Sequence, residues 1–395
     1  MRVLVSCTPG LGHLHPVVPL AEALRSAGHD VAFATSASFV PTVEELGFAA
    51  FPVGPDWVET HADDVLPGFL SATADEHIRC FAEIAGRGTV DDLLGVIDAW
   101  QPDAVVRTPA EFAAWPAAER SGRPHVVVGF MVPLPRELVT DWAGSELQAL
   151  LERAGVAPDP ALERVFGDLY LDFMPPVLLP PDWPVPAARQ VVRPSLAQAR
   201  TRTPPPWLGA YDRPIVLVTF GTIFNSRPEL WARTVEAVAG LPVDVVATYG
   251  HGRPIPEVGP VPANVRFEPY VDLAAVLPSC AAVVTHGGYG TVVAALLYGV
   301  PMCCIPVTAD NPVNAFAVEQ AGAGVACTTG LLQRIPIGFA DPALLSAGSV
   351  RSALTRLLDD PSYRTRAQEL GATIADLPPV DVAVDRLTAL TRASS

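Results

Sequence analysis

The sequence contains no lysine, so all 26 of its cationic side chains are arginines. Without lysine the chain lacks the cation of a phosphate-binding P-loop and the amine that Schiff-base and pyridoxal chemistry require. Only 17% of the residues are charged, and the formal net charge is −16. Because nucleic acid and anionic lipid bind to basic surfaces, this balance excludes nucleic acid as a partner and disfavours a membrane surface. An anionic ligand would have to be held by local dipoles and a few cations.

Paired cysteines and long apolar runs are missing as well. The six cysteines form no CxxC pair, which argues against a zinc cluster or a redox motif. We expect them to be small, buried, apolar side chains. No run reaches the roughly 18 apolar residues of a membrane-spanning helix, and the short apolar start of the chain does not resemble a signal peptide. We therefore expect a cytoplasmic protein.

The length and the apolar pattern predict the fold class. At 395 residues the chain exceeds the roughly 250–300 residues at which one hydrophobic core stops growing. Short apolar segments alternate with helical spacing in both halves, which is typical of parallel α/β sheets. The sequence therefore predicts two Rossmann-like, doubly wound α/β domains facing a central cleft. We expect strands at 3–7, 30–35, 104–107, 125–130, 215–220, 243–248, 281–285 and 302–306.

The helices and domain boundaries follow from the same pattern. Prolines are dense at 175–214, which predicts an interdomain linker at about 190–213. The domains would span 1–200 and 201–376, with a C-terminal helix at about 377–395 that packs back on the first. The irregular stretch 54–89 would form loops and helices over the cleft. We expect helices at 16–27, 42–46, 110–120, 228–239, 290–297, 314–320 and 349–393, the last interrupted at prolines 378–379.

The most informative motif is a glycine-rich turn at 285–291, between a predicted buried strand and a predicted apolar helix. Glycines let the backbone approach a ligand closely, and a helix start offers N–H donors and a partial positive charge that suit a diphosphate. His286 adds a donor that can share charge with a phosphate oxygen. The alternative is an ordinary tight turn with an incidental histidine.

Two further segments of the second half carry polar groups after predicted strands. Asp310 and Asn311 present an acceptor and a mixed donor and acceptor, which suit the vicinal hydroxyls of a sugar. Helix capping is the alternative explanation of this pair. Thr222 follows Phe220 and Gly221, and its hydroxyl could face the same phosphates, unless this is an ordinary turn at a strand end.

The first half opens with a Gly-His segment after its first strand. It is not a GxGxxG motif, because His15 stands where the third glycine would be, and a dinucleotide-dependent oxidoreductase is therefore disfavoured. Pro16 fits the first turn of a helix, which would place His13 on the preceding loop, facing the cleft. An imidazole there can act as a general base near neutral pH. A structural histidine that caps the turn is the alternative, and His15 is a weaker candidate.

Taken together, these motifs resemble the GT-B glycosyltransferases of family 1, in particular the bacterial enzymes that attach sugars to antibiotics and other natural products. The resemblance covers essentially the whole chain and is most specific from Val271 to Gly324. It implies an inverting transfer of a sugar, or deoxysugar, to a small hydrophobic aglycone. The donor would be a UDP- or dTDP-sugar, which is a co-substrate, so no cofactor is expected.

The resemblance also implies a role for particular residues. His13 would deprotonate the acceptor, the backbone near Val271 would read the nucleobase, and Asp310 and Asn311 would contact the sugar. The diphosphate would be bound by His286, Gly287, Gly288, Gly290 and Thr291, with Thr222 assisting. The acceptor pocket would include Trp57, Phe69, Phe81, Phe112, Phe130 and Met131.

The sequence departs from the family pattern at two positions. Many relatives place an acidic residue after the fourth strand to orient the base histidine, whereas Thr108 stands here. Glu111, one turn later, could substitute for it. Asn311 stands where relatives often have glutamine, and the shorter amide could favour a deoxysugar or another donor stereochemistry.

Several questions stay open at the level of the sequence. The acceptor nucleophile could be oxygen, nitrogen or carbon. No Asp-x-Asp motif is present, so we expect metal-independent transfer. A nucleotide-sugar epimerase of the same fold is an alternative, although no obvious carboxylate pair supports it, and so is a catalytically weak relative that activates a partner enzyme. The acceptor, the donor sugar and the oligomeric state, a homodimer included, are not defined by the sequence.

Overall fold

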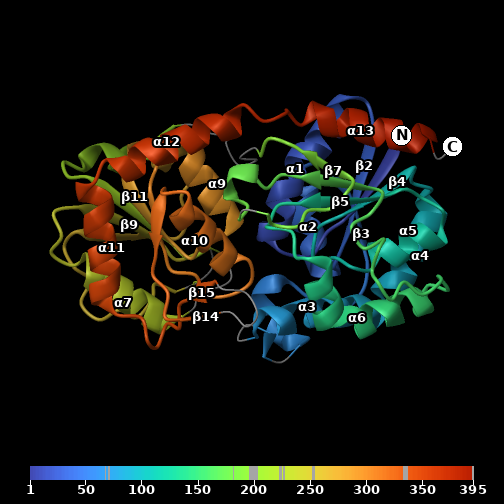
Figure 1. Ribbon diagram of the computed structural model, residues 1–395, viewed down its shortest axis with the longest axis horizontal. Helices are drawn as coiled ribbons and strands as arrows, with labels where there is room; N and C mark the ends of the chain where they lie inside the picture. Colours follow the sequence, from blue (N-terminus) through green and yellow to red (C-terminus); the bar gives the residue numbers. More distant parts are fainter. Residues whose placement is uncertain are drawn as a thin grey trace. The chain divides into compact units, whose positions relative to one another are not determined.

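The computed structural model describes residues 1–66, 68–69, 72–180, 182–194, 203–221, 225, 227–250, 254–331 and 337–393. The chain forms two compact units, each built around its own sheet (Figure 1). Within the described ranges, no helix is long and apolar enough to cross a bilayer. The first unit comprises Met1–Pro175, Pro181–Ser195 and Leu377–Ser395, and the second comprises Pro176–Pro180 and Leu196–Asp376.

The first unit contains a seven-stranded, wholly parallel sheet in the order β3-β2-β1-β4-β5-β6-β7. Its central strands are valine-rich and fully buried, as expected for strands covered on both faces. The strands are β1 (Arg2–Ser6), β2 (Asp30–Thr35), β3 (Ala49–Pro52), β4 (Ala104–Arg107), β5 (His125–Gly129), β6 (Leu169–Asp172) and β7 (Arg189–Val191). The helices are α1 (Leu11–Ser26), α2 (Val40–Glu44), α3 (Ala74–Ile84), α4 (Val90–Trp100), α5 (Ala114–Arg120), α6 (Arg136–Arg153) and α13 (Asp381–Ala393).

The second unit repeats this design with a six-stranded parallel sheet in the order β10-β9-β8-β11-β12-β13. A short antiparallel pair, β14 (Gly330–Leu331) and β15 (Gly338–Phe339), stands apart from that sheet. The strands are β8 (Ile215–Thr219), β9 (Asp244–Thr248), β10 (Val265–Glu268), β11 (Cys280–Thr285), β12 (Met302–Cys304) and β13 (Gly324–Ala326). The helices are α7 (Pro228–Val238), α8 (Leu273–Val276), α9 (Tyr289–Leu297), α10 (Asn311–Gln320), α11 (Ala347–Asp359) and α12 (Ser362–Ala375).

Helix α1 begins five residues earlier than the sequence predicted. The extended backbone of Gly10 starts it, so that Pro16 and Pro19 both lie inside the helix. Each internal proline costs about 3 kcal/mol, but eight residues of α1 are buried, and a buried leucine or valine contributes about 1.5–3 kcal/mol. The placement of His13 on a loop before the helix is therefore wrong, because this side chain projects from the first turn of α1.

The C-terminal region forms three helices rather than one interrupted helix, because a second break at 360–361 separates α11 from α12. Helix α12 is tied to the second sheet by Arg364, whose guanidinium donates to the carbonyl oxygens of Cys280 and Ala281 at 2.7 and 2.9 Å. Helix α13 belongs to the first unit and packs against α1 (Figure 1).

Candidate functional site

In both sheets the order in which successive strands are added changes direction beside the first strand of the unit. This happens between β1 and β4 in the first sheet and between β8 and β11 in the second. At such a point the loops that leave two neighbouring strands diverge, which opens a crevice at the carboxyl ends of the strands. The loop after β1 leads to His13, and the loop after β11 carries the glycine-rich turn. The topology of each unit therefore brings the motifs found in the sequence to a ligand-binding position.

The glycine-rich turn of the second unit is packed around the ring of His286. A Cβ atom on Gly221 would lie 2.8 Å from His286 Nε2, and one on Gly288 would lie 2.5 Å from it. Gly221 also has a φ of +71°, which side chains rarely adopt. His286 is 8% exposed. Glycine at both positions is what allows the imidazole to sit against the backbone here.

Burial changes the protonation of His286. Desolvation lowers its pKa to about 4, opposed by a hydrogen bond to the Thr219 backbone. The ring is therefore neutral at pH 7, and its Nδ1 atom is buried without a hydrogen-bond partner among the described residues. A neutral imidazole still offers a directional contact.

Helix α9 begins directly after this turn, with Gly288 as its N-cap residue in an extended conformation. A Cβ atom on Gly290 would meet no atom within 4 Å, so the backbone of the first helical turn faces open space. The hydroxyl of Thr285 accepts a hydrogen bond from the Gly287 amide at 3.1 Å and fixes the turn. Thr291, which follows Gly290, is buried. These features make the helix start accessible to an anion.

Helix α10 begins at Asn311, three residues earlier than predicted, and its start is connected to the same turn. The carboxylate of Asp310 accepts hydrogen bonds from Asn311 Nδ2 at 3.1 Å and from Asn314 Nδ2 at 2.7 Å. Asn314 also donates to the carbonyl oxygen of Gly287 at 2.9 Å. Asn314 thus joins two predicted donor-binding segments. Asn314 was not predicted as a site residue, although its spacing of four residues from Asp310 on a helix was a signal.

The remaining predicted donor residues lie at the edge of this arrangement. Val271 is buried and immediately precedes Asp272, whose carboxylate caps α8 by accepting from the Ala274 amide at 2.9 Å. Thr222 lies outside the described residues.

In the first unit, His13 is held between two aromatic rings. Its imidazole makes edge-on contacts with Phe81 of α3 and Phe130 after β5, at centroid distances of 5.9 and 5.5 Å. His13 is 7% exposed. Two rings on different elements therefore define the orientation of the predicted base.

Thr108 and Glu111 lie on the loop after β4. The Thr108 hydroxyl accepts a hydrogen bond from the Thr8 amide at 3.3 Å and so joins the loops after β1 and β4. The Glu111 carboxylate accepts from the amides of Ala113 and Ala114 at 3.0 and 3.1 Å. These bonds explain why α5 begins at Ala114 and not at residue 110. Burial raises the pKa of Glu111, opposed by the Ser6 hydroxyl, by Arg107 and by the two amides.

A fully buried arginine, Arg107, forms hydrogen bonds with the loop after β4. The guanidinium of Arg107 donates to His125 Nε2 at 3.0 Å and to the carbonyl oxygens of Thr108, Pro109 and Val165. Burial lowers the pKa of Arg107 to about 10, so it remains charged at pH 7. The central carbon of this guanidinium lies 5.4 Å from the centroid of the Phe112 ring.

The residues predicted to line the acceptor pocket do not all lie together. Trp57, Phe69 and Phe81 form one cluster, in which Phe69 and Phe81 are 5.3 Å apart and Trp57 and Phe81 are 6.3 Å apart. Phe112 belongs instead to the main core of the unit. Met131, next to Phe130, is half-buried. The structure thus brings Phe81 and Phe130 to His13, and Trp57 and Phe69 to Phe81.

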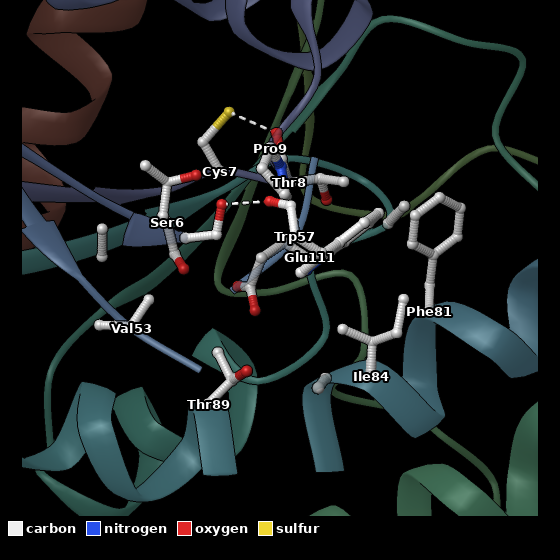
Figure 2. A pocket seen from close by; sticks show the side chains of 15 residues that line it. Ser6, Cys7, Thr8, Pro9, Val53, Trp57, Phe81, Ile84, Thr89 and Glu111 are labelled. Atoms are coloured by element: carbon white, nitrogen blue, oxygen red, sulfur yellow. Dashed lines mark hydrogen bonds between the residues drawn. The ribbon is translucent and has the colours of Figure 1, made fainter. Parts of the chain in front are cut away.

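A pocket adjoins this cluster at the carboxyl ends of β1 and β2. Its cavity volume is about 40 Å³, and it opens to solvent. Figure 2 shows the carboxyl group of Glu111 among the lining side chains, with Ser6 and Val53 on one side and Phe81 and Ile84 on the other. Ser6 and Thr35, which end β1 and β2, also line it and were not predicted as site residues. Small hydroxylated residues at strand ends are too common to have been singled out.

Known proteins match this chain over nearly its full length. Models of the N-terminal and C-terminal domains of erythromycin biosynthesis protein CIII-like proteins match residues 22–182 and 232–390. TDP-daunosamine transferase DnrS of Streptomyces peucetius is 31% identical, covering 99% of this chain and 97% of that protein. Elloramycin glycosyltransferase ElmGT of Streptomyces olivaceus is 33% identical, covering 98% and 97%.

Solved structures agree with these matches. The glycosyltransferase SnogD from Streptomyces nogalater is 30% identical, with a TM-score of 0.73 and 99% of each chain covered. VinC, a glycosyltransferase solved with dTDP, is 28% identical, with a TM-score of 0.76 and 100% of each chain covered. The two parallel-sheet units and these neighbours define a glycosyltransferase of the GT-B fold. The chain belongs to the erythromycin biosynthesis protein CIII-like family of bacterial antibiotic glycosyltransferases.

Proposed function

We propose that the protein transfers a sugar, or deoxysugar, from a dTDP- or UDP-sugar to a small hydrophobic natural-product aglycone, with inversion at the anomeric carbon. The observation that supports this most strongly is the glycine-packed turn at the start of α9, placed where the second sheet opens. The names of two relatives point to thymidine diphosphate in particular, since one transfers TDP-daunosamine and another was solved with dTDP.

The donor residues would divide the nucleotide sugar among them. Gly288, Gly290 and Thr291 would present the start of α9 to the diphosphate, where backbone amides stabilise the charge that develops on the leaving group. His286, with Gly287 and Thr222, would complete that contact. Asp310 would accept hydrogen bonds from sugar hydroxyls, with Asn311 beside it, and the backbone near Val271 would contact the base.

His13 would remove the acceptor proton as the nucleophile attacks. General base catalysis of this kind contributes about 10²–10⁴-fold, so we expect His13→Ala to lower kcat by that factor. The affinity for dTDP should not change, because His13 lies on the first unit and the donor residues on the second. Mass-spectrometric detection of product from a panel of nucleotide sugars and aromatic or polyketide aglycones would measure kcat, and calorimetry would measure dTDP affinity. Full turnover by His13→Ala would contradict the proposal.

A role for Glu111 in orienting His13 stays a prediction. A carboxylate that orients a base histidine also stabilises the protonated imidazole. An amide in its place should therefore lower kcat. Turnover by Glu111→Gln close to that of the wild type would therefore contradict it.

We further propose that transfer requires neither a divalent metal nor a cofactor. The helix start and its glycine-lined turn would supply the charge stabilisation that a metal gives in other transferases. Turnover should therefore be the same in EDTA as in Mg²⁺. Loss of product in EDTA that returns on adding Mg²⁺ would show that a metal takes part.

A further inference from the structure

The side chain of Asn314 is 0% exposed and lies where helix α10 meets the glycine-rich turn of the second unit. Its amide nitrogen donates to the carbonyl oxygen of Gly287 at 2.9 Å and to Asp310 Oδ2 at 2.7 Å, so both amide hydrogens are used. Its amide oxygen is buried and, among the described residues, has no hydrogen-bond partner. Because a buried acceptor without a partner is costly, packing alone does not account for an asparagine at this position.

The carboxylate of Asp310 is held from two sides. Asn314 Nδ2 donates to its Oδ2 atom, and Asn311 Nδ2 donates to its Oδ1 atom at 3.1 Å. Donors on both oxygens fix the plane of the carboxylate. Each oxygen still has a lone pair that can accept from another donor. Asp310 is therefore oriented before a ligand binds and keeps the capacity to bind one.

The backbone just before Asp310 has an unusual conformation. Ala309 has a φ of +54°, in the left-handed region that residues with a Cβ atom rarely adopt. Such a conformation persists only where the surrounding contacts maintain it. The Asn311 amide donates to the Thr308 carbonyl oxygen at 3.1 Å across this bend, and the bond from Asn314 fixes the side chain that follows it. Asn314 thus contributes to holding a strained loop in place.

The glycine-rich turn depends less on Asn314 than Asp310 does. A Cβ atom on Gly287 would lie 3.0 Å from the carbonyl oxygen of Asn311, so the turn and the start of α10 are in backbone contact. The Gly287 amide is also bound by the Thr285 hydroxyl. Loss of the Asn314 amide should therefore disturb Asp310 and its loop more than the turn.

We propose that Asn314 is a positioning residue for the sugar end of the donor. It holds Asp310 in place, and so it sets how strongly the site prefers an intact nucleotide sugar to the nucleoside diphosphate that is left after transfer. The inference rests on the proposed function, which places the diphosphate at the start of α9 and the sugar at Asp310.

Calorimetry on the full-length protein with dTDP and with dTDP-glucose tests this role. Asn314→Leu keeps the shape of the side chain and removes both donors. It should weaken binding of dTDP-glucose about tenfold or more and binding of dTDP less than about threefold. Partial unfolding would weaken both by the same factor, so the ratio of the two dissociation constants reports positioning and not stability.

A second substitution tests the link to the strained loop. Glycine adopts the left-handed conformation without steric cost, so Ala309→Gly should stabilise the bend that Asn314 no longer supports. Added to Asn314→Leu, it should restore dTDP-glucose affinity about threefold or more.

Asn264→Leu is the matched control. The Asn264 amide also donates to two carbonyl oxygens, those of Val238 and Val243, at 3.1 and 3.2 Å. It does so before β9 and β10, at the amino ends of the strands of the same unit. Asn264→Leu should lower the Tm and leave the ratio of the two dissociation constants unchanged.

The proposal is overturned if Asn314→Leu weakens both nucleotides alike or neither, if Ala309→Gly restores nothing, or if the wild type binds neither nucleotide. Because calorimetry requires no turnover, the two proposals fail separately. The expected change in ratio in a protein that transfers no sugar would contradict the proposed function alone. An unchanged ratio in an active transferase would contradict the role of Asn314 alone.

Discussion

His15 and His286 show how burial sets the protonation of single residues in this protein. Desolvation lowers the pKa of each to about 4, from the ordinary value of 6.5. A histidine that must stay neutral in the folded state contributes stability above the unfolded pKa and loses it as the pH falls. The two units should therefore both become less stable between pH 6.5 and 4.

His15 allows this to be measured away from the donor site. The loss at pH 4.5 from this residue alone should be about 2 kcal/mol, since one pKa unit corresponds to about 1.4 kcal/mol. We expect His15→Gln to narrow the difference in Tm between pH 7.5 and pH 4.5. Thermal unfolding followed by circular dichroism would measure it, and an unchanged difference would mean that His15 protonates freely in the folded protein.

The start of α9 is the element on which donor binding depends in our proposal. Gly288 has ordinary backbone angles, but a Cβ atom there would lie 2.5 Å from His286 Nε2, whereas one on Gly290 would meet nothing within 4 Å. Gly288→Ala should therefore weaken dTDP binding about tenfold or more by displacing the imidazole.

Gly290→Ala is the matched control and should change dTDP affinity less than threefold. Calorimetry with dTDP and the full-length variants would measure both. Equal effects of the two substitutions would show that the His286 ring is not part of the donor contact, because only Gly288 is packed against it.

The sequence predicted elements well where periodicity was clean. The strands at 30–35 and 104–107 have the predicted bounds, and the parallel α/β class is confirmed. Helix starts were less predictable. The sequence predicted a helix start at Pro16, whereas tertiary burial allows this proline to lie inside α1. Helix α4 was not predicted, although its buried residues Val90, Leu93 and Ile97 follow helical spacing. Helix α6 was not predicted either, and its backbone departs from helical angles at Ala143.

The candidate site was predictable to a similar extent. The turn around His286 could be placed because it follows a strand end, where the topology of a parallel sheet positions it. His13 was expected on a loop and lies instead in the first turn of α1. The polar residues that line the pocket of the first unit could not be predicted in this way. Ser6, Thr35 and Glu111 come from three segments far apart in the sequence, and their proximity follows from the order of β2, β1 and β4 in the sheet.

At the scale of the whole molecule, the two units have separate cores, yet the chain returns to the first unit at its end. Helix α13 buries Ala383, Val384 and Leu387 in that unit. The final residues thus contribute to the stability of the unit that contains the N-terminus.

Leu387→Ala should therefore destabilise only the first unit. A buried leucine truncated to alanine costs about 2–5 kcal/mol, which corresponds to a fall of roughly 5–15 °C in the Tm of a unit of this size. Differential scanning calorimetry should show one transition lowered and the other unchanged. Arg386→Ala, at the exposed neighbouring position, should shift neither transition. A parallel fall of both transitions would mean that the units unfold as one.

The buried guanidinium of Arg107 has a consequence for engineering acceptor range by exchanging segments between relatives. It donates to carbonyl oxygens on the loop after β4 and on the segment before β6, and to the ring of His125 on β5. A lysine in its place has three donors on a single nitrogen and could not reach all of these partners. A loop at 108–113 that is exchanged between relatives would therefore have to be transferred together with Arg107, His125 and the segment before β6.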